Sequence, residues 1–174
     1  MRPKIRLEGT FGTVFYIAIG IVLALAINQG LAFALSTDMP VVAVESNSMV
    51  PTFYKGDILI IQGTSPEQYW NSLKIKDIIV FSPEGKSTPI VHRLIKKNAD
   101  GTFQTMGDAN NGRQLPFEKH ILPEQIHGKV VFIIPFLGWI KIGATEYLLP
   151  NTGWVLLLAI TVTFLYITIK DRIR

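Results

Sequence analysis

The sequence predicts a mainly β protein, in which a small all-β domain is flanked by two membrane-spanning helices. Two observations predict the β domain: short β-branched and aromatic runs bounded by Gly, Pro, Asp or Ser fill the middle of the chain, and apolar 3.6-residue periodicity is weak there. A third observation predicts the helices, because an uncharged apolar segment lies near each end. The length of 174 residues suits one compact domain with such additions.

Each apolar segment is long enough to cross a bilayer, which takes about 20 apolar residues as a helix. The segments run from Phe11 to Leu35 and from Asn151 to Ile169. The predicted organisation is a cytoplasmic N-terminus at 1–10, a transmembrane helix at 11–35, an extracytoplasmic β domain at 36–150, a transmembrane helix at 151–169 and a cytoplasmic C-terminus at 170–174.

Basic residues at the two ends of the chain predict its orientation in the membrane. Positive charge beside a span marks the cytoplasmic side. The basic residues concerned are Arg2, Lys4, Arg6, Lys170, Arg172 and Arg174. We therefore expect a two-pass protein of the cell membrane, with both termini cytoplasmic and the middle domain outside.

The first apolar segment also has features of a cleaved signal peptide, because Ala32-Phe33-Ala34 offers small residues at a cleavage site after Ala34. Its apolar run from Phe11 to Ile27 exceeds the 7–15 residues usual for a signal core. An uncleaved anchor is the favoured interpretation.

The strand-like runs indicate a small barrel or a folded sheet. Pro66 after Ser65 predicts a short helix, and Asn98 to Gly101 predicts a hairpin turn. The predicted strands lie in "VVAVES", "GDILIIQG", "DIIVFS", "PIVHRLIKK", "GTFQTMGD" and "GKVVFIIP".

Composition excludes several kinds of function. The net charge of +4 comes without a long basic run in the middle of the chain, which argues against nucleic acid as a partner. The absence of cysteine excludes disulfides, thiol catalysis and thiolate metal sites. His92, His120 and His127 lack metal-ligand spacing, so we expect no metal and no cofactor.

Three residues could together carry acyl-transfer chemistry. Ser48 follows a predicted strand and precedes a turn fixed by Pro51, His92 lies within a strand, and Asp108 follows the next strand. A hairpin would bring His92 and Asp108 together, so that a nucleophile, a general base and an orienting anion are available. Taken singly, each also fits an ordinary role: a turn serine, a half-buried strand histidine and a turn aspartate.

Four motifs together resemble type I signal peptidases. The stretch "SNSMVPTFYKGDILI" resembles the first signature of that family, "IVHRLI" the second and "TMGDANN" the third, and "GKVVFIIPFLGWI" resembles its closing strand and membrane-contact segment. Most bacterial members have a lysine in the second motif. This chain has His92, which resembles the endoplasmic-reticulum-type branch found in eukaryotes, archaea and some Gram-positive bacteria.

The resemblance implies roles for individual residues. It implies Ser48 as nucleophile, His92 as base and Asp108 as the third member, with Ser46 and Met49 at the oxyanion site or substrate pocket. The family usually carries a second aspartate six residues after the first. Gln114 stands at that position in this chain, so the second carboxylate of the family is not present there.

The implied activity is that of a membrane-bound serine endopeptidase, which removes signal peptides from secretory preproteins by cutting after small residues. Its expected partners are those preproteins and the lipid bilayer, with a transient contact to the secretion translocon left open. The apolar segment from Ile133 to Gly143 fits either the lipid interface or a core strand and turn. Two alternatives from other classes are a non-catalytic membrane subunit and a peptide-binding adaptor with the same fold.

Overall fold

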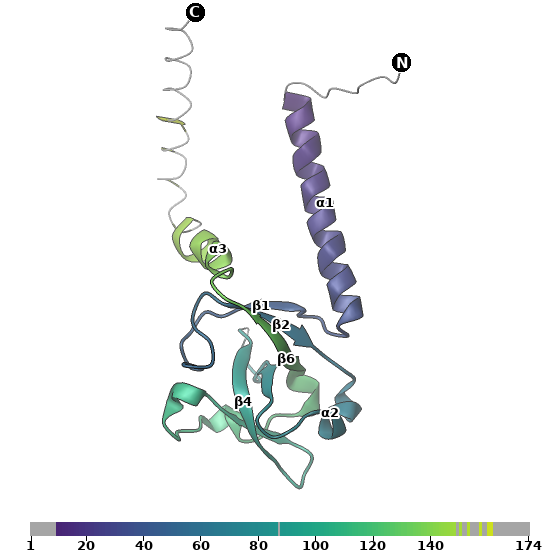
Figure 1. Ribbon diagram of the computed structural model, residues 1–174, viewed down its shortest axis with the longest axis vertical. Coiled ribbons are helices and arrows are strands. Elements are labelled where there is room, and N and C mark those ends of the chain that lie inside the picture. The colour runs from purple at the N-terminus through teal and green to yellow at the C-terminus, as the bar shows by residue number, and fades with distance from the viewer. Residues whose placement is uncertain are drawn as a thin grey trace, which may run out of the picture.

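The computed structural model describes residues 10–86, 88–148, 150, 153, 157, 160 and 161. The middle of the chain forms one antiparallel sheet of six strands in the order β1-β2-β6-β3-β4-β5. This confirms the mainly β prediction (Figure 1). The strands are β1 (Val41–Ala43), β2 (Ile58–Gln62), β3 (Ile78–Phe81), β4 (Ile90–Lys97), β5 (Phe103–Met106) and β6 (Ile126–Ile134).

Short helices and turns connect the strands. The expected short helix after Ser65 is α2, with Pro66 at its first position, and the expected hairpin turn joins β4 to β5. The connecting helices are α2 (Pro66–Ser72) and the 3-10 turns η1 (Asp108–Asn110), η2 (Pro116–Glu118) and η3 (Pro123–Gln125). All three 3-10 turns lie in the connection between β5 and β6, and η1 and η2 lie next to the candidate site.

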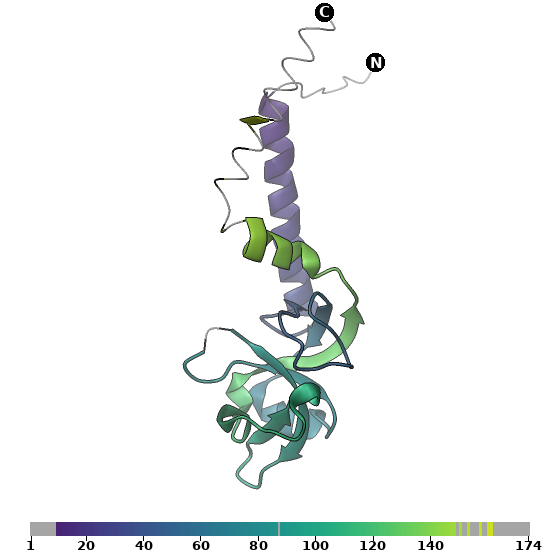
Figure 2. The ribbon, with the colours of Figure 1, turned by 90° about the vertical axis from the view of Figure 1, so that its left-hand side faces the viewer.

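The predicted N-terminal helix is present as α1 (Thr10–Ala34). Its segment Gly12–Ala34 is, among the residues that the structure describes, the one helix long and apolar enough to cross a membrane. The chain leaves the sheet through α3 (Trp139–Ile142) and the π-helical η4 (Gly143–Leu148). Both α1 and the α3–η4 segment lie at the same end of the β domain (Figures 1 and 2). The second predicted span, 151–169, falls almost entirely outside the described residues.

The sheet buries apolar side chains in two clusters, because successive strand residues point to opposite faces. One cluster consists of Tyr69, Leu73, Ile79, Phe81, Leu94, Phe103, Ile121 and Ile126. The other consists of Val44, Met49, Phe53, Leu59, Ile61 and Val80. The second cluster contains residues from the loop between β1 and β2, so it holds that loop against the sheet.

The segment after β6 packs on the same loop. Gly56 has a positive φ of 97°, and a Cβ there would overlap the Trp139 ring. The backbone amide of Gly138 also donates to the Gly56 carbonyl at 2.8 Å. The start of α3 is therefore fixed to the loop that carries Ser48.

Candidate active site

Ser48 lies on the loop between β1 and β2, which is held in place on both sides. Val44 N–H donates to Asp57 O and Gly56 N–H donates to Val44 O, both at 2.9 Å. These two backbone hydrogen bonds join the two ends of the loop. The Ser48 carbonyl accepts a 2.9 Å hydrogen bond from Ala109 N–H in η1. The serine hydroxyl thus stands on a fixed backbone, as the sequence predicts.

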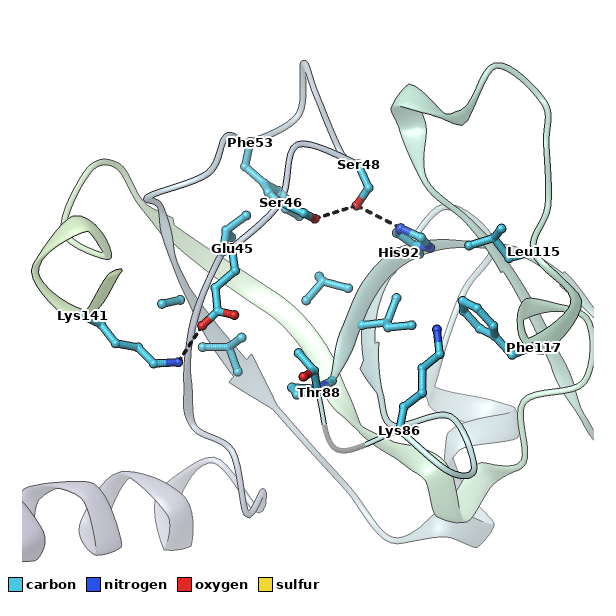
Figure 3. A pocket seen from close by; sticks show the side chains of 16 residues that line it. Glu45, Ser46, Ser48, Phe53, Lys86, Thr88, His92, Leu115, Phe117 and Lys141 are labelled. Carbon is cyan, nitrogen blue, oxygen red and sulfur yellow. Dashed lines mark hydrogen bonds and ion pairs between the residues drawn. The ribbon is translucent and has the colours of Figure 1, made fainter. Parts of the chain in front are cut away.

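His92 lies on β4 and is almost completely buried, with 4% of its surface exposed. Its Nε2 is 3.0 Å from Ser48 Oγ, although 44 residues separate the two in sequence. This is the spacing of a hydroxyl that donates its proton to an imidazole base. The predicted pairing of Ser48 with His92 is therefore present in the structure, and Figure 3 shows it as a dashed line.

The carboxylate against His92 is Glu118, which sequence reasoning missed. Glu118 Oε1 contacts His92 Nδ1, and Glu118 Oε2 accepts a 2.7 Å hydrogen bond from Leu115 N–H. Glu118 is fully buried at the end of η2. The one signal in the sequence was Pro116 followed by Glu118, since proline at the first position and Glu at the third are typical of a helix start.

The structure places Asp108 elsewhere than expected. Its carboxylate accepts hydrogen bonds from Arg93 Nε at 2.8 Å and from an Arg93 terminal nitrogen at 2.6 Å, and a third from the Thr52 hydroxyl. The Arg93 guanidinium, helped by the Thr52 hydroxyl, holds the pKa of Asp108 below its usual range. This corrects the expectation that Asp108 contacts the His92 ring. Arg93 follows His92 on β4, so its side chain points to the opposite face of the sheet, and it is Arg93 that binds the Asp108 carboxylate.

The side chain of Ser46 lies beside the Ser48 hydroxyl, whereas the side chain of Met49 points into the core. Ser46 Oγ is 3.3 Å from Ser48 Oγ, and both side chains line the same pocket (Figure 3). Met49 is 1% exposed and belongs to the core cluster with Val44 and Phe53. Met49 therefore anchors the loop from beneath, which corrects the expectation that it lines the oxyanion site or substrate pocket.

The backbone amide of Ser48 is a candidate oxyanion donor. No acceptor for this N–H is found among the residues that the structure describes. An amide that has no partner next to a nucleophilic hydroxyl can donate to the negative oxygen of a tetrahedral intermediate.

The pocket in front of Ser48 has a volume of about 620 Å³. That is within the range of about 300–1,000 Å³ typical of ligand sites. Its walls come from β1 and the residues after it, from the start of β4, and from the segment before Glu118 (Figure 3). Lys141 of α3 closes one side through a 3.1 Å ion pair with Glu45. Within the described part of the chain, no group of three or more His, Asp and Glu side chains could hold a metal ion.

A second serine-histidine-carboxylate set occurs in the same domain, formed by Ser82, His127 and Asp38. Ser82 Oγ is 2.8 Å from His127 Nε2, and His127 Nδ1 is 2.9 Å from Asp38. The Ser82 amide already donates to Gln125 O, and the next residue, Pro83, has no N–H. Neither Ser82 nor Pro83 therefore offers a free backbone N–H to an oxyanion, and the set connects Asp38, just after α1, to the sheet.

A buried histidine between a loop serine and a buried carboxylate is the arrangement found in serine hydrolases of the Ser-His-carboxylate type. Comparison with known proteins identifies the family. Residues 12–100 match the model of the family described as "Signal peptidase, peptidase S26". The chain belongs to this signal peptidase family, in its endoplasmic-reticulum-type branch, and is a protease of that class.

Three relatives illustrate the similarity. The chain is 31% identical over 126 residues to the signal peptidase complex catalytic subunit SEC11 of Metarhizium robertsii, which covers 68% of this chain and 72% of the relative. It is 37% identical over 130 residues to SEC11 of Saccharomyces cerevisiae strain YJM789, covering 68% and 73%. It is 32% identical over 132 residues to sec11 of Dictyostelium discoideum, covering 71% of each.

Proposed function

We propose that this protein is a membrane-anchored serine endopeptidase that removes signal peptides from secretory preproteins by cutting after small residues. The single observation that carries the proposal is the 3.0 Å approach of His92 Nε2 to Ser48 Oγ at the wall of an open pocket. The names of the relatives as catalytic subunits of a signal peptidase complex point to the same substrate class. They also favour the enzyme over a non-catalytic subunit or a peptide-binding adaptor.

The substrate is an extended peptide that binds between two strand edges. β1 is an edge strand of the sheet, and the pocket follows its continuation through Glu45 and Ser46. On the opposite wall of the pocket, β4 pairs with β5 only from Arg93 onward. The residues of β4 before Arg93 therefore have no β5 partner on that edge. An extended chain can add to such an edge through main-chain hydrogen bonds, while side-chain pockets give specificity.

The reaction proceeds through an acyl-enzyme. Ser48 Oγ attacks the scissile carbonyl carbon and His92 Nε2 takes its proton. The resulting oxyanion accepts hydrogen bonds from the Ser48 amide and the Ser46 hydroxyl. The C–N bond then breaks, and the leaving amine of the mature protein takes the proton from Nε2. Water, deprotonated by Nε2, hydrolyses the ester, and Ser48 regains its proton as the signal peptide leaves.

The membrane is the expected setting of this site. α1 is long enough to cross a bilayer. The turn before α3 exposes Phe136, and α3 itself exposes Trp139 and Ile140, at 76%, 44% and 73% of their surfaces. Aromatic and aliphatic side chains at this position favour contact with the lipid interface. The proposed topology keeps both termini in the cytoplasm and the β domain outside, so that an inserted preprotein meets Ser48 close to the membrane surface.

The test is cleavage of a preprotein by the full-length protein in detergent, with the cut mapped by mass spectrometry. We expect one cut after a small residue at the end of the signal peptide. Ser48→Ala and His92→Ala should both abolish the cut. The unfolding temperature of Ser48→Ala should stay close to that of the wild type, whereas His92→Ala should unfold at a lower temperature because it leaves the buried Glu118 carboxylate without its partner. Processing by Ser48→Ala at the wild-type rate, or cuts scattered through the mature part, would refute the proposal.

A further inference from the structure

The carboxylate of Glu118 has no role in the chemistry that the sequence motifs imply, yet it lies at the centre of the site. It is 0% exposed and contacts His92 Nδ1, while Nε2 of the same ring faces Ser48 Oγ. We propose that Glu118 is the positioning residue for His92. It keeps the proton of the neutral ring on Nδ1, leaves Nε2 free to accept from Ser48, and stabilises the imidazolium formed during attack. This inference rests on the proposed roles of Ser48 and His92.

The surroundings of Glu118 are built to keep a carboxylate in this place. A buried carboxylate is costly unless hydrogen bonds compensate for the lost water. Leu115 N–H donates to Oε2 at 2.7 Å, and the buried Thr105 hydroxyl lies 3.4 Å from Oε1. The Gln114 side-chain amide donates to the carbonyl oxygens of Thr105 and Glu118, both at 3.0 Å. Gln114 thus ties the backbone of Glu118 to β5.

Asp108 is poorly placed to perform the same role. His92 and Arg93 are neighbours on β4, so their side chains point to opposite faces of the sheet. Arg93 binds both oxygens of Asp108 and also reaches the Lys76 carbonyl at 2.9 Å. Turning the Asp108 carboxylate toward His92 would break this bidentate pair. Glu118 approaches from the His92 side of the strand, and among the described residues His92 is the one basic side chain that pairs with it.

The two oxygens of Glu118 make an isosteric substitution informative. In Glu118→Gln, the amide oxygen must face Leu115 N–H, because an NH₂ group there would oppose a backbone donor. The NH₂ group then faces His92 Nδ1 and donates to it. The neutral ring is forced to carry its proton on Nε2, where it can no longer accept from Ser48.

The experiment compares Glu118→Gln with Asp108→Asn, a matched change from carboxylate to amide on the other side of β4. Both are made in the full-length protein in detergent, and kcat and KM are measured on a preprotein. We expect Glu118→Gln to lower kcat by about 10⁴-fold, the loss seen when the orienting carboxylate of a serine protease becomes an amide, with KM changed little. Asp108→Asn should lower kcat far less. A kcat for Glu118→Gln near that of the wild type, or an equal loss in Asp108→Asn, would overturn the inference.

Two further measurements keep the test independent of folding and of substrate choice. In the wild type at a pH where the ring is neutral, ¹⁵N NMR of labelled histidine, with the His92 signals identified by their loss in His92→Gln, should show Nδ1 protonated. A proton on Nε2 would contradict the proposal. The rate at which a fluorophosphonate labels Ser48 reports serine activation without a peptide. If the wild type labels but cuts no preprotein, the substrate assignment fails, while slower labelling of Glu118→Gln still supports Glu118.

Discussion

Gly107 offers a sharp test of the site geometry, because it packs directly against the two reacting residues. A Cβ added at this position would lie 2.7 Å from Ser48 O, 2.9 Å from His92 Nε2 and 2.9 Å from the Asn110 side-chain nitrogen. The φ of Gly107 is −70°, a value that any residue adopts. The effect of Gly107→Ala is therefore steric and does not come from the backbone conformation.

The size of the effect follows from these distances. Carbon contacts are most favourable at about 3.5–4.0 Å, so the neighbours of the new methyl group must move by roughly 0.5–1 Å. A misplacement of about 1 Å at a catalytic centre can cost about 100-fold in rate. Overpacking of this kind costs about 1–3 kcal/mol in the free energy of unfolding. We expect Gly107→Ala to lower kcat by about 10–100-fold, because it pushes His92 away from Ser48.

The assay is preprotein cleavage under saturating substrate, with thermal unfolding measured alongside. Gly143→Ala is the control: no atom lies within 4 Å of a Cβ there, and its φ is −58°. This control should cut and unfold like the wild type. Wild-type turnover by Gly107→Ala would show that the close packing of Gly107 against Ser48 and His92 is not the working arrangement.

Three further predictions concern neighbouring groups. Ser46→Ala should lower kcat by up to about 100–1,000-fold, the range for one lost oxyanion donor; a change confined to KM would assign Ser46 to substrate binding instead. Because Arg93 lowers the pKa of folded Asp108, the carboxylate stabilises the fold above its unfolded pKa of about 3.9. This contribution is lost as the pH falls through the lower folded value. The unfolding temperature of Asp108→Asn should thus fall below that of the wild type at pH 7, and the difference should narrow in acid; a constant difference from pH 7 to pH 2 would contradict this. Gln114→Asp places a carboxylate against two backbone carbonyl oxygens and removes their donor. It should lower the unfolding temperature, and it should lower kcat because the backbone of Glu118 loses its connection to β5. Higher activity of this variant would refute the role given to Gln114.

Much of the fold could be predicted from local patterns. The strands are marked by β-branched runs, the turn at 98–101 by its Asn-Ala-Asp-Gly sequence, and α1 by an uncharged apolar run, because each depends on residues close in sequence. The order of the strands in the sheet, in contrast, does not follow from local patterns. β6 pairs with both β2 and β3, and this long-range pairing is decided by which apolar faces pack together.

The site residues also divide into those that local motifs identify and those that only the tertiary packing brings to the site. Ser48 and His92 were identifiable because each lies in a recognisable motif, and the sequence by itself determined which atoms could react. The tertiary structure decided which carboxylate lies against the His92 ring. Asp108 and Glu118 both follow β5 in 3-10 turns of three residues, which are too short for a sequence period to predict the direction of a side chain. Arg93 draws Asp108 to one face of β4, while the Leu115 amide and a fully buried environment hold Glu118 against the ring on the other, and these packing contacts are absent from any local pattern in the sequence.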